Sequence, residues 1–244
     1  NILYSAVKTR LSPPFRFICF TYEPSGLHPD IEVRPIPDLG LPQQAWATGA
    51  WPKIGVFAKE AFDFEGRALF IDLDTMINGD LAPFFDGKDT FQTIGPKSWT
   101  KRRAKHPAVY RWLKPKIRAL EHKLGLAPPP LPSTGKHMEI APTNMGTGIF
   151  AFDIGAHTDI VDALCSDVPR ALRLYRNEQH FVQNHLKDWQ GWPDKTICSV
   201  KYHLRRSIWQ SFFRHPMPPP SWAPIVAFHG DPRPMDMAMK RVSR

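Results

Sequence analysis

The sequence predicts a single α/β domain, with helices on both faces of a mixed, mostly parallel sheet. Its 244 residues suffice for one large domain with an ample core. Segments with helical and strand patterns follow one another along the chain, as in α/β folds. The run 68–78 (ALFIDLDTMIN) is apolar on both faces as far as Asp72, which is typical of a central strand covered by helices on both sides.

Apolar spacing and turn residues predict the elements in chain order. The expected helices are 2–11, a helix beginning at Trp51, 158–174 and a helix opening at Asn177. The expected strands are 15–20, 31–36, 68–78, the segment after a glycine-rich turn at 144–148, 195–202 and a strand beginning at Ile225. A doubly wound domain normally begins with a strand, whereas this chain begins at Asn1 with a helical pattern, so we expect a first strand to be missing.

Composition narrows the class of protein. Hydrophobic residues make up 42% of the chain and charged residues 23%, as is usual for soluble globular proteins. We expect no membrane span and no signal peptide, because neither pattern is present in the sequence. Cys19, Cys165 and Cys198 are odd in number and lack paired spacing, so we expect a cytoplasmic protein without a disulfide framework or a zinc site. The net charge of +9 favours partners that carry phosphate.

A basic, proline-rich segment at 96–142 differs in composition from the rest of the chain. Its Lys and Arg residues are interleaved with Trp99, Tyr110 and Trp112, and it holds too few apolar residues for a core of its own. We therefore interpret it as an insertion in the domain. It could bind single-stranded nucleic acid, an anionic membrane surface or a phosphorylated acceptor, and a solvated helix followed by a proline loop explains the composition equally well.

The pair Asp72 and Asp74 carries the clearest chemical signal. Residues two apart on a strand point the same way, so both carboxylates are expected to face one spot. They follow an apolar run, and ligands of α/β sheets bind beyond the carboxyl ends of the strands. Two neighbouring carboxylates repel unless a cation neutralises them, and their oxygens suit Mg²⁺ or Mn²⁺. This pattern predicts a metal–phosphate site, although an Asp-x-Asp pair can also simply cap a turn.

Further polar groups are expected at loops or strand ends. The turn 144–148 (NMGTG), which begins at Asn144, has small residues that let a backbone approach a ligand closely. Glu178 and Gln179 open a helix, where an acid also complements the helix dipole. The last expected strand ends in His229, Gly230 and Arg233, of which the arginine can hold phosphate oxygens in a bidentate manner.

Together these stretches resemble the metal-dependent GT-A glycosyltransferases, most closely the glycogenin-like and galactosyltransferase-like retaining enzymes and their bacterial relatives. The resemblance runs from about 15 to 234, leaves most of 96–142 unmatched, and is strongest in the apolar strand with Asp-x-Asp preceded by Trp51-Pro52-Lys53. It implies a Rossmann-like GT-A fold for the whole chain, 1–244.

The resemblance implies a role for each site residue. Asp72 and Asp74 match the metal-binding pair on the diphosphate of a sugar nucleotide, and Lys53 matches a basic residue that contacts the donor. Glu178-Gln179 resembles the acidic-Gln pair near the transferred sugar, with Glu in place of the commoner Asp. The family has a Gly-x-x-Lys-Pro motif near its C-terminal end that binds the diphosphate, and Gly230, Arg233 and Pro234 match it, with Arg in place of Lys. The resemblance also implies that His229 is the third metal ligand. In the glycogenin-like pattern that histidine stands three residues before the glycine, whereas here it directly precedes it.

The activity implied is hexosyl transfer from a nucleotide sugar, expected to be a uridine diphosphate sugar, with Mn²⁺ or Mg²⁺ and with retention of configuration. The acceptor implied is an envelope glycan or glycolipid. With the basic insertion against an anionic membrane, the protein is expected in the cytoplasm or peripherally at the inner membrane face. We expect no nucleic-acid partner, because the sequence has no recognised nucleic-acid motif.

Two other interpretations explain parts of the sequence. Haloacid-dehalogenase-like phosphatases carry Asp-x-Asp after an apolar strand, and Gly230-Asp231 with Asp236 fits the spacing of their terminal acidic motif. Against this, about 70 residues precede the motif here, and Met76 stands where that family prefers Thr or Val. Alternatively, the chain is a basic binding protein without catalysis, or an inactive transferase, in which Asp72 and Asp74 are only structural.

Overall fold

The structure is a computed structural model that describes residues 1–96, 116, 120, 144–204 and 218–228. Its α-helices are α1 Ile2–Arg10, α2 Gln43–Ala47, α4 Thr158–Ser166, α5 Val168–Leu174 and α6 Glu178–His185. Tighter 3₁₀ turns form η1 Trp51–Phe57, η2 Lys59–Ala61 and η3 Ala82–Phe85, and a π-helix, η4, spans Val200–Leu204. The strands are β1 Phe17–Phe20, β2 Ile31–Arg34, β3 Arg67–Ile71, β4 Thr75–Ile77, β5 Gln92–Ile94, β6 Gly146–Asp153, β7 Gln190–Gly191, β8 Ile197–Ser199 and β9 Ile225–Ala227.

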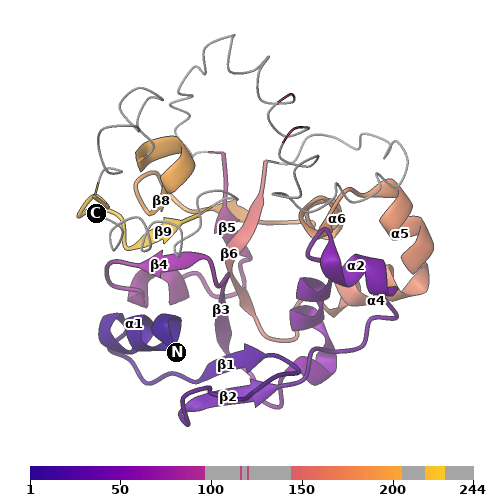
Figure 1. Cartoon of the computed structure of the whole chain (residues 1–244), viewed down its shortest axis with the longest axis horizontal. Coiled ribbons are helices and arrows are strands. Elements are labelled where there is room, and N and C mark those ends of the chain that lie inside the picture. Colours follow the sequence, from indigo (N-terminus) through magenta and orange to yellow (C-terminus); the bar gives the residue numbers. More distant parts are fainter. Residues whose placement is uncertain (97–115, 117–119, 121–143, 205–217, 229–244) are drawn as a thin grey trace.

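The described strands form three sheets, with the orders β3-β6-β5-β7, β4-β9-β8 and β1-β2 (Figure 1). The pairs β1–β2, β5–β7 and β8–β9 are parallel, and β3–β6, β4–β9 and β5–β6 are antiparallel. The predicted α/β class with a mixed sheet is confirmed. The prediction that the strands are mostly parallel is not, because the described pairings divide evenly between the two kinds.

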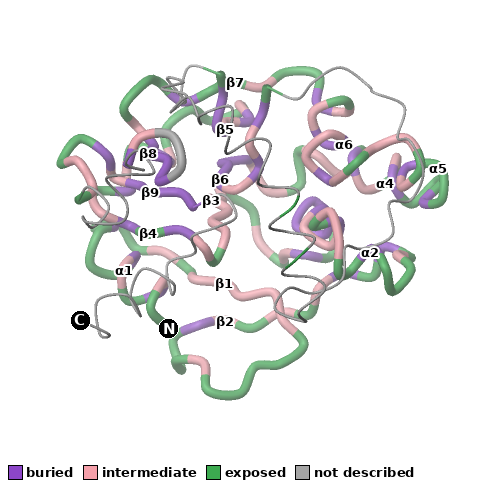
Figure 2. The backbone as a smooth tube through the Cα atoms, turned by 45° about the horizontal axis from the view of Figure 1, so that its top comes forward, coloured by how far each residue is buried: buried purple, intermediate pink, exposed green. Residues whose placement is uncertain are grey.

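Strand β6 is the central strand of the described fold. Phe150 and Phe152 point into one buried cluster, which η1, α4, α5 and α6 complete. The alternate residues, Ile149 and Ala151, point into a second cluster with α1, η3, β4, β8 and β9. Figure 1 shows these two groups of elements on opposite sides of β3 and β6, and Figure 2 shows buried residues along β6, β8 and β9. Helices therefore cover one face, while α1, η3 and a second sheet cover the other.

The predicted strand 68–78 is two strands. β3 ends at Ile71, β4 begins at Thr75, and the three residues between them turn. Backbone hydrogen bonds fix this turn, because the Asp72 amide donates to the Gly148 carbonyl at 2.9 Å and the Phe228 amide donates to the Asp74 carbonyl at 3.3 Å. The chain thus passes here from the sheet that contains β6 to the sheet that contains β9. β3 is half-buried along its length and, among the described strands, pairs only with β6, so the expectation of a central strand is wrong.

Two of the other predictions match the structure, and two match it only in part. Helix 2–11 corresponds to α1, and α6 begins after Asn177, whose side chain caps the helix by accepting from the His180 amide at 3.1 Å. The predicted helix 158–174 is split, because Asp167 caps a new helix, α5, and accepts from the Arg170 amide. The expected turn at 144–148 is wrong in part, since β6 already begins at Gly146.

Strand 195–202 is shorter than predicted, because the chain enters the π-helix η4 after β8. The strands β5 and β7 and the helix α2 were not predicted. Nearly all of the basic insertion 96–142 lies outside the described residues, so its role stays a prediction, as does the missing first strand. Among the described residues, no helix is long and apolar enough to cross a membrane.

Phe150 lies within a group of aromatic rings in the larger core. It is 1% exposed, its ring stacks on Phe70 at 4.7 Å between centroids and on Phe91 at 5.3 Å, and Phe57 lies 5.6 Å away. These contacts join β3, β6 and the residue just before β5 to η1.

We expect Phe150→Ala to lower the free energy of unfolding by about 3–5 kcal/mol, because it leaves a cavity among the rings of Phe57, Phe70 and Phe91. Urea denaturation followed by circular dichroism measures the change. Leu73→Ala is the control, since Leu73 is 85% exposed and its truncation removes little buried surface. A loss at Phe150 no larger than that at Leu73 would contradict the packing described.

Candidate functional site

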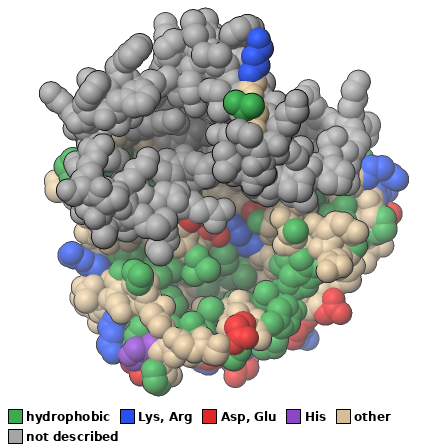
Figure 3. All heavy atoms as spheres, viewed as in Figure 1, with side chains coloured by type: hydrophobic (Ala, Val, Ile, Leu, Met, Phe, Trp, Pro, Cys, Tyr) green, Lys and Arg blue, Asp and Glu red, His purple; other side chains and the backbone are tan. Residues whose placement is uncertain are grey.

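A hollow of about 230 Å³ lies beside the turn between β3 and β4. It is lined by Lys53, Asp72, Asp74, Thr75, Thr147, Gly148, Glu178, Gln179, Ala227 and Phe228. Five of the predicted site residues (Lys53, Asp72, Asp74, Glu178 and Gln179) therefore meet at one place, although they come from three separate stretches of the chain. Figure 3 shows acidic, basic and hydrophobic side chains next to one another on the face of the molecule drawn there.

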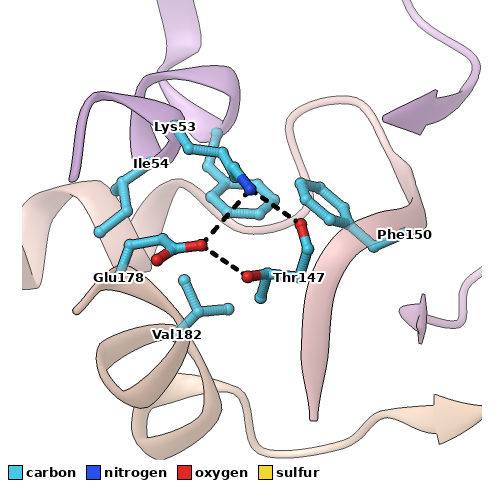
Figure 4. Close-up of a pocket in the computed structure, with 7 residues that line it drawn as sticks. Lys53, Ile54, Thr147, Phe150, Glu178 and Val182 are labelled. Atoms are coloured by element: carbon cyan, nitrogen blue, oxygen red, sulfur yellow. Dashed lines mark hydrogen bonds and ion pairs between the residues drawn. The ribbon is translucent and has the colours of Figure 1, made fainter. Parts of the chain in front are cut away.

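Lys53 connects the parts of this site. It projects from η1, and its Nζ lies 2.9 Å from Asp72 Oδ1 and 3.0 Å from Asp72 Oδ2. The same Nζ donates to the Thr147 carbonyl at 3.1 Å and lies 3.5 Å from Glu178 Oε1 (Figure 4). Because its side chain is only 13% exposed, this ammonium is an internal cation shared by two carboxylates.

Glu178 is the most deeply buried acid of the hollow. It is the first residue of α6 and is 4% exposed. Its Oε1 accepts a 2.5 Å hydrogen bond from Thr147 Oγ1, and its amide donates to the Gly49 carbonyl at 2.9 Å. Burial raises the pKa of Glu178, and the Lys53 charge and the Thr147 hydrogen bond oppose that shift.

Asp72 and Asp74 share the hollow without sharing a strand. The side chain of Asp72 is 32% exposed. Burial raises the pKa of Asp72, the charge of Lys53 lowers it, and the negative charge of Asp74 raises it further. The prediction that both carboxylates face one spot is thus confirmed, but the turn between two strands places them there, not the alternation of one strand.

In the described part of the chain, the side chains that could bind a metal ion in the hollow are the two carboxylates of Asp72 and Asp74. Among the described residues, no group of three or more His, Cys, Asp or Glu side chains is placed to hold a metal ion. No described side chain forms a hydrogen bond or ion pair with the carboxylate of Asp74, which leaves its oxygens available at the hollow. Asp72 and Asp74 fit an ion such as Mg²⁺ or Mn²⁺, which is held by one or two carboxylates and otherwise by water and phosphate.

The glycine-rich segment contributes two residues to the hollow. A Cβ at Gly148 would lie 3.4 Å from Asp72 Oδ2, an ordinary van der Waals contact, so this glycine lies beside a carboxylate of the chain itself, and the approach of its backbone to a ligand stays a prediction. Thr147 was not predicted. The sequence did contain a signal for it, a threonine between two glycines at the start of an apolar strand. A hydroxyl group at such a position is buried and needs a hydrogen-bond partner, and Thr147 is indeed only 3% exposed.

The other predicted residues are not part of the described hollow. Asn144 is exposed and is not among the residues that line the hollow. Its backbone amide donates a hydrogen bond to Gln183 Oε1 at 2.9 Å. His229, Gly230 and Arg233 lie outside the described residues, so their predicted roles remain predictions. The segment before them does line the hollow, at Ala227 and Phe228.

Comparison of the chain with protein-family models, with curated proteins and with solved structures finds no match. The geometry of the described residues is therefore the basis for assigning a function.

We expect Lys53→Met to lower the free energy of unfolding by about 3–5 kcal/mol, because it leaves Asp72 and Glu178 without their shared cation. Lys59→Met, at an exposed position six residues further on, should change it by less than about 0.5 kcal/mol. The double variant Lys53→Met/Glu178→Gln should lose less than the sum of the single variants, because the two residues interact directly. Chemical denaturation of the unsubstituted protein, of Lys53→Met, Glu178→Gln and the double variant, and of the control Lys59→Met measures these changes, and additive losses would contradict the shared ion pair.

The raised pKa of Glu178 also predicts how stability depends on pH. The folded protein keeps the Glu178 proton to a higher pH than the unfolded chain, whose ordinary pKa is 4.5, so ionisation of this group destabilises the fold as the pH rises above that value. The stability of Glu178→Gln relative to the unsubstituted protein should therefore increase with pH above 4.5. Urea unfolding over a pH series, with the exposed Glu65→Gln as control, measures this, and a relative stability that declines with pH would refute the direction.

Proposed function

We propose that this chain is a metal-dependent glycosyltransferase that moves a sugar from a uridine diphosphate sugar to a glycan or glycolipid acceptor. One observation carries the proposal. The acids, the lysine and the Glu-Gln pair, which were selected from separate stretches of the sequence, line a single hollow. A site of this kind combines metal ligands with a buried acid, as sugar transfer from a diphosphate needs.

In this proposal Asp72 and Asp74 hold Mn²⁺ or Mg²⁺ against the donor diphosphate. When bound, the ion neutralises the charge that develops on the departing nucleoside diphosphate. Lys53 and the hydrogen bond from the Asp72 backbone amide to the Gly148 carbonyl fix the orientation of Asp72, whereas the turn carries Asp74 into the hollow. Such preorganisation matters because fixed charges need not reorganise during the reaction.

Lys53 has a different role in this proposal from the one expected from sequence. Its Nζ is within 3.5 Å of oxygens from three residues, so it acts on the donor through Asp72 and Glu178 and not as a direct phosphate ligand. Glu178 and Gln179 then face the sugar. An oxocarbenium-like transition state carries positive charge, which a buried carboxylate or amide oxygen stabilises. Retention of configuration is part of the proposal and rests on the sequence resemblance.

The acceptor and the location are proposed from the sequence alone. The basic segment 96–142 would contact an anionic membrane surface, and with it a glycolipid or envelope glycan acceptor.

Isothermal titration of uridine diphosphate, with and without Mn²⁺, tests the proposal. We expect binding that requires Mn²⁺ and that Asp74→Ala weakens at least about tenfold, because Asp74 is one of the two metal ligands proposed among the described residues. Asp86→Ala is the matched control, an exposed aspartate on the loop after η3, and should bind like the unsubstituted protein.

A folded protein that binds no uridine diphosphate with Mn²⁺ would overturn the proposal. Hydrolysis of phosphate esters that is abolished by Asp72→Asn would instead support the phosphatase interpretation, in which the first aspartate is the nucleophile.

A further inference from the structure

Two consecutive residues before η1 have left-handed backbone conformations. Gly49 has φ +74°, and Ala50 has φ 54° and ψ 27°. A left-handed conformation is unfavourable for a residue with a Cβ, and Ala50 is one of only three residues other than glycine with positive φ in the described part of the chain. Backbone strain of this kind persists where the surrounding structure imposes it, and often at functional sites.

The carbonyls of these two residues hold the two charged elements of the site. The Glu178 amide donates to the Gly49 carbonyl at 2.9 Å, at the start of α6. The Lys53 amide donates to the Ala50 carbonyl at 3.0 Å, in the first turn of η1. Adjacent peptide units thus fix the backbones of both partners of the ion pair between Lys53 and Glu178.

Packing leaves no room for another residue at Gly49. A Cβ there would lie 2.7 Å from Trp51 Nε1 and 3.4 Å from the Arg176 carbonyl. The indole of Trp51 cannot easily give way, because it is 3% exposed and packs edge-on against Phe181 of α6 at 5.8 Å. Gly49 is therefore packed between Trp51 of η1 and the residues just before α6, the two elements that the corner aligns.

We propose that the Gly49–Ala50 corner is a positioning device that sets the distance between Lys53 and Glu178. Its conformation turns one carbonyl toward each element, so a change of φ at either residue moves the two side chains relative to each other. The positioning of the ion pair is argued from the backbone hydrogen bonds alone. That this positioning affects binding of the sugar donor rests on the proposed glycosyltransferase function. Both residues act through their backbones and have no chemical role of their own.

Acylation of lysines followed by mass spectrometry tests the corner without reference to the activity. In the unsubstituted protein, Lys53 should react at least about tenfold more slowly than the exposed Lys59, because its ammonium is enclosed and reacts only through local opening. In Gly49→Ala the added Cβ displaces Trp51 and strains the corner, and we expect Lys53 to lose most of this protection while Lys59 reacts as before.

Gly26→Ala is the matched control. Gly26 has the same φ of +74°, and a Cβ there would meet nothing within 4 Å, so the substitution imposes the same strain without the contact. Thermal unfolding establishes a temperature at which both variants are folded, and Lys53 should stay protected in Gly26→Ala. If Gly49→Ala does not fold, Ala50→Val replaces it, because Ala50 is exposed and the left-handed conformation is strongly unfavourable for a β-branched residue.

Equal protection of Lys53 in the corner variants and in Gly26→Ala would overturn the proposal. Uridine diphosphate titrated with Mn²⁺ then adds the functional result, for which we expect at least about tenfold weaker binding in Gly49→Ala only. Faster acylation of Lys53 in Gly49→Ala, together with no uridine diphosphate binding by any of the proteins, would support the positioning role of the corner and overturn only the proposed function. Unchanged uridine diphosphate affinity despite deprotection would overturn the link between the corner and the donor.

Discussion

The described site depends on the interactions of the Lys53 ammonium group. It contacts oxygens of Asp72, Thr147 and Glu178, which belong to the turn after β3, to β6 and to α6. Without it, two buried or half-buried carboxylates would face each other across a small hollow, and their mutual repulsion would add to the cost of burial. A single cation therefore allows acids from separate elements to come together, and the remaining polar groups are arranged around it.

The fold supplies the rigidity that this arrangement needs. Lys53, Thr147 and Glu178 come from η1, β6 and α6, whose apolar side chains share one buried cluster. Phe57, four residues after Lys53, packs on Phe150, three residues after Thr147. A displacement of one charged group would thus disturb the aromatic core, and the core holds the charged groups within contact distance.

Local features of the sequence predicted what is local in the structure. α1 and the start of α6 follow from apolar spacing and the Asn177 cap, and the apolar run before Asp72 led to the position of the hollow. The break between β3 and β4 could not be predicted in this way, because both halves have strand-like sequences and the bonds that separate them come from Gly148 and Phe228, far along the chain. Thr147 and Gly49 were missed for the same reason, since each acquires its role from Glu178 or its neighbours.

The turn between β3 and β4 has a consequence for the mechanics of the whole molecule. Asp72 is tied to Gly148 in one sheet, and Asp74 is tied to Phe228, which directly follows β9 of the other sheet. Relative motion of the two sheets would therefore change the separation of the carboxylates. Any ligand that binds both aspartates at once would brace one sheet against the other, and by mass action it would raise the melting temperature of the folded chain as its concentration increases.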